Sequence, residues 1–323
     1  MYSKLHYNKL IVSLCFTLLS FTSVQAQQSY TQIVANAKLT EVSQTITLKE
    51  GKASQKITGD TEYNNEEEKS AILLSKLGCL PQNGINQSQQ NATLADCAAL
   101  KPLTIDYPTV SASLTSLMNQ LLDDNVFEGY NIKAKEVTTT SESGKNITLY
   151  GHSSLVHAKQ LISLLIVNNV NFSWQLIPKS SAFNIRESWQ DSKEEEKASS
   201  IRTAQEYDLR LNFVNQAEQK SFMALINQFA KKDREDHTGL IIDAWWQPFY
   251  RTFHPQDSFT AVKRISLQAD GFVASTLVLI PNVNKVLKQI NNTLSKTNIN
   301  VSLSSEDVWV NPAFYRYLNG DFK

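Results

Sequence analysis

The chain has 323 residues, with 31 Lys and Arg against 31 Asp and Glu, so its formal net charge is zero. Nucleic-acid binding requires a basic surface that neutralises phosphates, and we therefore expect no nucleic-acid partner. The length allows two compact domains at the usual 100–200 residues each. No segment after residue 26 reaches about 18 uninterrupted apolar residues, so we expect no membrane span in the mature chain.

Residues 1–26 have the pattern of a secretory signal peptide. Lys4 and Lys9 precede an apolar run over residues 10–21, and Val24-Gln25-Ala26 places small residues two apart. The run is shorter than the ~20 residues that cross a bilayer, although an uncleaved membrane anchor is the alternative. We therefore expect an exported protein, periplasmic first and extracellular second, that begins near Gln27. Loss of the two lysines shifts its formal charge to about −2.

Residues 27–101 are expected to form an N-terminal segment with a hairpin and a short helix. Residues 45–48 and 54–58 alternate between apolar and polar side chains around Glu50-Gly51-Lys52, which is typical of a β-hairpin. A helix is predicted from Glu67 to Leu77, ended by Gly78.

Two cysteines, Cys79 and Cys97, remain once the leader and its Cys15 are removed. Two such cysteines in an exported protein usually form a disulfide. Closing a loop of about 20 residues contributes about 3 kcal/mol by the chain-entropy model. A redox-active or nucleophilic thiol is the alternative, but neither a CxxC spacing nor a nearby histidine supports it. We therefore predict a Cys79–Cys97 loop.

Residues 102–190 are predicted to form a first module with the element order β-α-β-β-α-β. Strict alternation predicts strands, and apolar residues three or four apart predict helices. Two helices on one face of an antiparallel sheet would bury the apolar side chains. The expected strands lie near 103–105, 130–134, 147–149 and 172–176, the last ended by Pro178, and the expected helices cover 110–121 and 155–165.

The same order repeats in residues 206–323, after a charged and serine-rich linker at 191–205. We therefore predict an α+β chain of two tandem ferredoxin-like (βαββαβ) modules after the disulfide-stapled N-terminal segment. The expected elements are strands at 207–213, 262–267, 272–280 and 299–303, a turn at Ala269-Asp270-Gly271, and helices at 222–229 and 283–294, the second of them following Pro281.

The repeated unit of turn, strand, helix and strand resembles the periplasmic ferredoxin-like modules of type IV pilus and type II secretion assembly proteins. The resemblance covers residues 130–176 and 262–303 and includes no specific motif, so it transfers no functional residue. It implies a ferredoxin-like fold and a role in envelope assembly. The chain departs from this group at its leader, because such proteins usually keep an uncleaved membrane helix.

An aromatic insertion at residues 239–255 is the strongest candidate binding surface. It contains Trp245, Trp246, Phe249, Tyr250 and Arg251, and residues of these types are enriched at interface hot spots. They could bind a glycan, a peptide or an envelope protein. The alternative is an extra strand whose rings pack onto the sheet, with Pro248 at an edge or a bulge.

No catalytic signature is present. The sequence contains neither a GxSxG elbow nor an SxxK pair, and a Ser-His-Asp triad would need His152 or His254 as its base. His237 and Asp243 lack the spacing of a known metal motif, so we expect no metal and no cofactor. We predict an exported, non-catalytic envelope protein that is a binding or assembly component. The alternative is a secreted hydrolase with an unrecognised Ser/His/Asp site, and the oligomeric state stays open.

Overall fold

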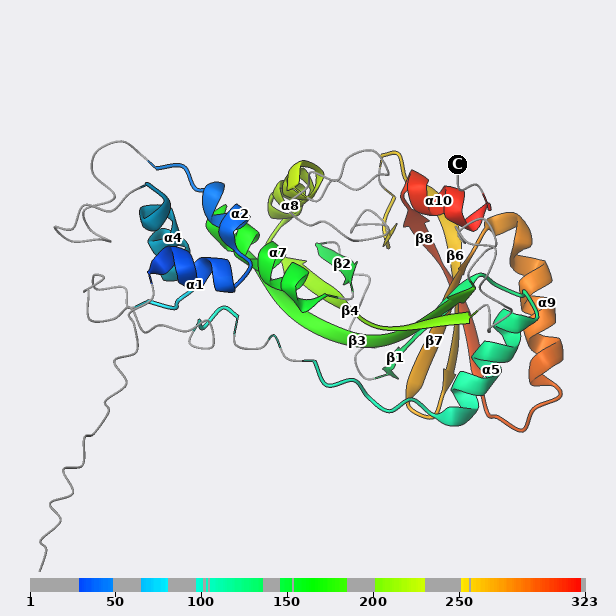
Figure 1. The fold of residues 1–323 in the computed structure, drawn as a ribbon. Helices are drawn as coiled ribbons and strands as arrows, with labels where there is room; N and C mark the ends of the chain where they lie inside the picture. Colours follow the sequence, from blue (N-terminus) through cyan, green and yellow to red (C-terminus); the bar gives the residue numbers. More distant parts are fainter. Residues whose placement is uncertain are drawn as a thin grey trace, which may run out of the picture.

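The computed structural model describes residues 29–48, 65–80, 97–100, 103, 105–135, 146–152, 154–184, 201–229, 251–255 and 257–320. Its strands form one antiparallel sheet in the order β2-β4-β3-β1-β7-β6-β8-β5 (Figure 1). The strands are β1 (Gly129–Ala134), β2 (Ile147–His152), β3 (Phe172–Asn184), β4 (Ile201–Phe213), β5 (Arg251–Thr252), β6 (Thr260–Ala269), β7 (Phe272–Val278) and β8 (Ser302–Val310).

Helices cover most of the outer face of this sheet. They are α1 (Tyr30–Asn36), α2 (Thr40–Gln44), α4 (Asn65–Lys76), α5 (Ala112–Asp123), α7 (Leu155–Val167), α8 (Gln216–Phe229), α9 (Val283–Leu294) and α10 (Pro312–Leu318), with a 3₁₀ turn, η4 (Ile280–Asn282), before α9. α10 packs on the inner face of β6 and β8, and α1, α2 and α4 pack beside α7. Within the described ranges, no helix is both long enough and apolar enough to cross a bilayer.

The prediction of two tandem ferredoxin-like modules is wrong, because all eight strands belong to one sheet. β3 and β4, expected in different modules, pair over thirteen residues from Phe172↔Phe213 to Asn184↔Ile201. β1 pairs with β7 of the expected second module, and β2 lies at the sheet edge beside β4. The alternation of apolar and polar residues identifies the buried face of each strand, but it does not identify the strand that pairs with it. The order of elements along the chain was therefore compatible both with two separate modules and with one continuous sheet.

Five of the eight helices within the described residues were predicted, whereas α1, α2 and α10 were not, and α8 begins six residues before its predicted start. α9 has the predicted bounds, and α4, α5 and α7 lie within a few residues of theirs. Residues 103 and 105, which are described, do not belong to a strand, so the expected strand at 103–105 is not found there. Thr45 ends α2, which contradicts the first half of the expected hairpin, and the second half lies outside the described residues.

β3 continues through Pro178 to Asn184, contrary to the expected end. Pro178 pairs with Tyr207 of β4 on one side. On the other side, the paired register with β1 covers only residues 180–183 of β3, so the strand is locally an edge at Pro178. A proline without an N–H is tolerated at such a position.

The predicted turn between β6 and β7 is confirmed. Asp270 and Gly271 have φ of 53° and 78°, the left-handed pair that a two-residue hairpin of type I′ requires. The Asp270 carboxylate also accepts hydrogen bonds from the hydroxyls of Ser111 (2.6 Å) and Ser113 (2.9 Å) at the start of α5. These bonds tie the hairpin to the helix that packs beside it.

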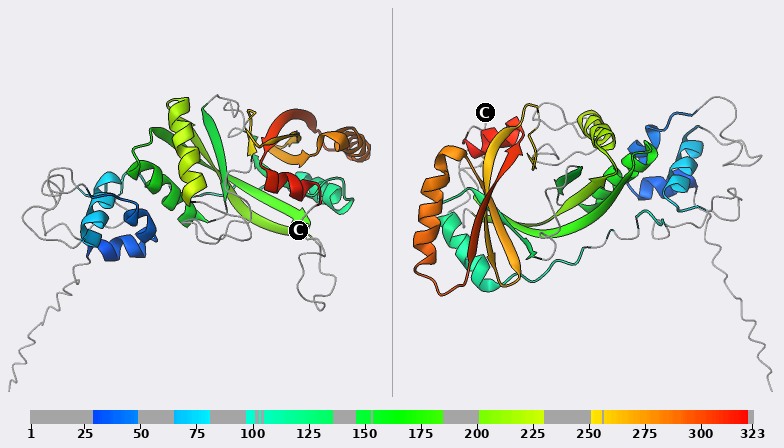
Figure 2. Two further views of the ribbon diagram at one scale, coloured as in Figure 1. Left: turned by 90° about the horizontal axis from the view of Figure 1, so that it is seen from above. Right: turned by 180° about the vertical axis from the view of Figure 1, so that it is seen from behind.

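The sheet is strongly curved and its outer face is apolar. Its inner face is polar over the middle strands but apolar where Val262, Val308 and Val310 pack against α10. α5 and α9 cover one half of the outer face, and α7 and α8 cover the other (Figures 1 and 2). The curvature brings the edge strands β2 and β5 close together, so the sheet is nearly closed. A row of small polar residues crosses the inner face: Ser304, Ser266, Ser275, Asn131 and Ser181.

The N-terminal helices α1, α2 and α4 pack beside α7 and share its apolar core. The predicted disulfide is confirmed, since Cys79 and Cys97 are bonded at the end of this unit. The Glu67 carboxylate on α4 accepts bonds from the N–H groups of Tyr30 (2.6 Å) and Thr31 (3.2 Å). It therefore satisfies donors at the start of α1 that the helix itself leaves unbonded.

Candidate functional site

The most unusual group of side chains is a cluster of buried charges inside the curved sheet, which we call the Asp208 cluster. It consists of Asp208, Lys133, Lys179 and Arg251, each at most 3% exposed. Lys179 Nζ lies 2.9 Å from Asp208 Oδ1, and Arg251 Nη2 lies 2.8 Å from Asp208 Oδ2. Lys133 also bonds to Asp208 Oδ2. Charged side chains are almost never fully buried unless they are paired, and this cluster meets that condition.

Strand register brings these four residues together from different parts of the chain. Asp208 lies on β4 opposite Ile177, so it shares a face with Lys179 two residues further along β3. Lys133 is on β1, beside β3, with its side chain on the same inner face. Arg251 comes from β5 at the opposite end of the strand order and reaches Asp208 because the sheet is curved.

Electrostatics keep the Asp208 carboxylate ionised. Burial by itself would raise the pKa of Asp208, but the attraction of Lys133, Lys179 and Arg251 outweighs burial, and the pKa lies well below its usual value. Glu206 adds a second carboxylate, whose Oε2 is 3.5 Å from Lys179 Nζ and accepts a 2.7 Å bond from Ser181. The cluster therefore cross-links four strands of the inner face.

Of the five predicted binding residues, only Arg251 lies within the described residues. Trp245, Trp246, Phe249 and Tyr250 lie outside the described residues. Arg251 is described, and it is buried in the Asp208 cluster. Sequence reasoning did not identify the rest of this cluster, although charged residues inside strands with alternating apolar side chains were a visible signal. Pairing between them depends on register, which the sequence did not reveal.

The side chains of His152 and His157 are in contact. His152 ends β2 and His157 lies in the first turn of α7, with ring centroids 3.8 Å apart. The Ser154 N–H donates to His152 Nδ1 at 2.8 Å, and His157 Nδ1 contacts both ring nitrogens of His152. These contacts are not those of a Ser-His-Asp triad.

Within the described ranges, no group of three or more His, Cys, Asp and Glu residues is arranged to hold a metal ion. His237 and Asp243, which we considered for a metal, lie outside those ranges.

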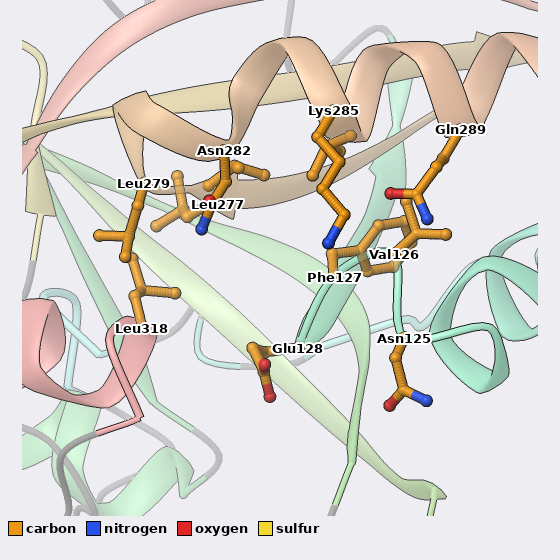
Figure 3. Close-up of a pocket in the computed structure, with 12 residues that line it drawn as sticks. Asn125, Val126, Phe127, Glu128, Leu277, Leu279, Asn282, Lys285, Gln289 and Leu318 are labelled. Atoms are coloured by element: carbon orange, nitrogen blue, oxygen red, sulfur yellow. The ribbon is translucent and has the colours of Figure 1, made fainter.

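A small pocket of about 140 Å³ lies where the loop after α5 meets α9 and α10. Lys285 and Gln289 extend from α9 toward Val126 and Phe127 (Figure 3). Its volume is below the 300–1,000 Å³ of typical ligand sites, so it fits at most a group of a few atoms. The other lining residues are Asn125, Glu128, Leu277, Val278, Leu279, Asn282, Val286 and Leu318.

Among the residues that the structure describes, most of β8 has no strand paired along one edge, which we call the open edge of β8. In the part of the chain that the structure describes, only Arg251 and Thr252 pair with this edge, opposite Val310 and Trp309. Residues 302–307 have β6 on their other side, and all of them except Leu303 are exposed. The second edge strand, β2, differs because Leu149 and Tyr150 are buried. The open edge of β8 is therefore the more accessible backbone surface.

Comparisons of this chain with protein-family models, with curated proteins and with solved structures find no match.

Proposed function

We propose that this chain is an exported, non-catalytic protein of the cell envelope, periplasmic in location, that acts as a binding or assembly component. The leader pattern of residues 1–26 and the Cys79–Cys97 disulfide support export, because disulfides persist in oxidising compartments. The partner in this proposal is another polypeptide rather than a small molecule.

The open edge of β8 is the observation that carries the binding role. An exposed strand edge presents a row of N–H and C=O groups that can pair with an added strand. Natural proteins usually block such edges with charge, a proline or a covering loop. Residues 302–305 contain three serines, one leucine and no charge, so this half of the edge is not blocked by charge.

Two measurements test the proposal. N-terminal sequencing and fractionation of the native cell should find the chain in the periplasm, starting near Gln27. A photo-crosslinking residue at Ser304 should capture a discrete protein in the envelope. The same probe at Lys288, an exposed position on α9, should not. A full-length cytoplasmic chain, or equal labelling from both positions, contradicts the proposal.

A further inference from the structure

We infer that the open edge of β8 pairs with the same edge of a second copy of this chain, so that two sheets join into one across a two-fold axis. This inference rests on the proposed function and names the partner at that edge. Closed two-fold dimers are the commonest homo-oligomers, and each copy in them uses the same self-complementary patch. β8 therefore has to be complementary to itself in an antiparallel orientation.

The charges of β8 permit this pairing. Its acidic residues, Glu306 and Asp307, lie at one end of the open stretch. Each is matched on the neighbouring strand β6, where Arg264 bonds to Glu306 and Lys263 Nζ lies 2.9 Å from Asp307 Oδ1. The carboxylates are thus partly neutralised within one copy and do not repel an approaching strand as isolated charges would.

Register determines what would lie opposite these carboxylates. A two-fold axis normal to the sheet pairs residues whose side chains are on the same face. If the axis passes at Ser304, this residue lies opposite Ser304 of the second copy, Leu303 lies opposite Ser305, and Ser302 lies opposite Glu306. If the axis passes at Ser305, this residue lies opposite Ser305 of the second copy, Ser304 lies opposite Glu306, and Leu303 lies opposite Asp307. In both registers each carboxylate lies opposite an uncharged residue, so the direct repulsion of like charges across strands is avoided. Small serines at the centre also leave room for close approach.

The interface is small, because only about six residues of each copy take part. Stable interfaces usually bury more than about 1,000 Å², so a dissociation constant between about 10 µM and 1 mM is expected. Sedimentation of the purified mature chain from low micromolar to millimolar concentration should show a reversible monomer–dimer equilibrium.

Substitution of Ser304 tests the site in either register. With the axis at Ser304, Ser304→Glu places the new carboxylates of the two copies opposite each other, and with the axis at Ser305 it places each new carboxylate opposite Glu306 of the other copy. The variant should therefore weaken dimerisation by about tenfold. Ser304→Gln, of similar size but neutral, is the matched control and should leave the constant nearly unchanged. Circular dichroism and thermal unfolding confirm that each variant folds. A dimer that Ser304→Glu leaves intact overturns the inference.

Cysteine crosslinking provides a second measurement. Cys79 and Cys97 are already paired, so a new cysteine in the mature chain would be its one free thiol. Either Ser304→Cys or Ser305→Cys should form a disulfide-linked dimer under mild oxidation, and Ser302→Cys, which lies away from both axes, should not. A chain that stays monomeric at millimolar concentration while β8 captures a different envelope protein overturns this inference but leaves the proposed function in place. A dimer crosslinked through residue 304 or 305 supports the inference even if no other envelope protein is captured.

Discussion

Asp208 and Arg251 meet inside the sheet with Oδ2 and Nη2 2.8 Å apart, although their strands, β4 and β5, are second and last in the strand order. The contact spans the inner space of the curved sheet instead of joining neighbouring strands. It fastens the short edge strand β5 to the opposite half of the sheet. The two lysines on β1 and β3 bind the same carboxylate, so one acidic side chain holds three basic ones.

Asp208→Asn should destabilise the protein strongly, by about 3–5 kcal/mol in the free energy of unfolding. The amide has nearly the same size, but it leaves the buried charges of Lys133, Lys179 and Arg251 without their carboxylate. Equilibrium unfolding in urea measures the change. Glu206→Gln is the matched control, because Glu206 is partly exposed and 3.5 Å from Lys179, and it should cost less than about 1 kcal/mol. Similar losses in both variants would contradict a central role for Asp208.

The stability of the protein in acid should also depend on the Asp208 cluster. The pKa of Asp208 in the folded protein lies well below its usual value because of the three basic neighbours, whereas the unfolded chain has an Asp pKa of about 3.9. A lowered folded pKa stabilises the protein above about pH 4, and this contribution is lost as the pH falls through the folded pKa. The free energy of unfolding, measured in urea, should therefore fall less steeply between pH 5 and pH 2 for Asp208→Asn than for the wild type. Equal slopes would show that Asp208 is not the responsible group.

Loss of the disulfide should destabilise mainly the N-terminal helical unit. Cys79 and Cys97 are 18 residues apart, and a loop of this length contributes about 3 kcal/mol in the chain-entropy model. A Cys79→Ser, Cys97→Ser double variant should lower the unfolding temperature. Its hydrogen exchange should rise in α4, and α9, which packs in a different apolar core, serves as the internal control. Equal acceleration in both helices would contradict a local effect.

Two buried tyrosines should respond differently to removal of their hydroxyl groups. The Tyr207 hydroxyl donates to the Ser154 carbonyl at 2.8 Å, whereas the Tyr150 hydroxyl is buried without a hydrogen-bond partner in the described structure. Tyr207→Phe should therefore cost about 1 kcal/mol, and Tyr150→Phe should be neutral or slightly stabilising. Thermal unfolding of the two variants compares them directly. A larger loss for Tyr150→Phe would show that its hydroxyl has a partner.

The sequence by itself determined the local elements, because they depend on interactions between near neighbours. Apolar spacing predicted α9 over residues 283–294, and Ala269-Asp270-Gly271 predicted the turn between β6 and β7. The count of two cysteines after the leader predicted the Cys79–Cys97 bond. Each of these inferences uses either a short stretch of chain or a simple count.

Only the tertiary structure decided which strands are neighbours and which charges are paired. β3 could have paired within a first module, but it pairs with β4 along its whole length, and β1 is next to β7. The alternation of β4 indicates that Asp208 shares a face with Glu206 and Arg210, but not that Arg251 will reach it. Strand pairing and the Asp208 cluster depend on contacts between residues far apart in the chain, together with the curvature of the whole sheet. The open edge of β8 could not be predicted from the sequence for the same reason, because a strand lies at an edge only when no other strand pairs with that side of it.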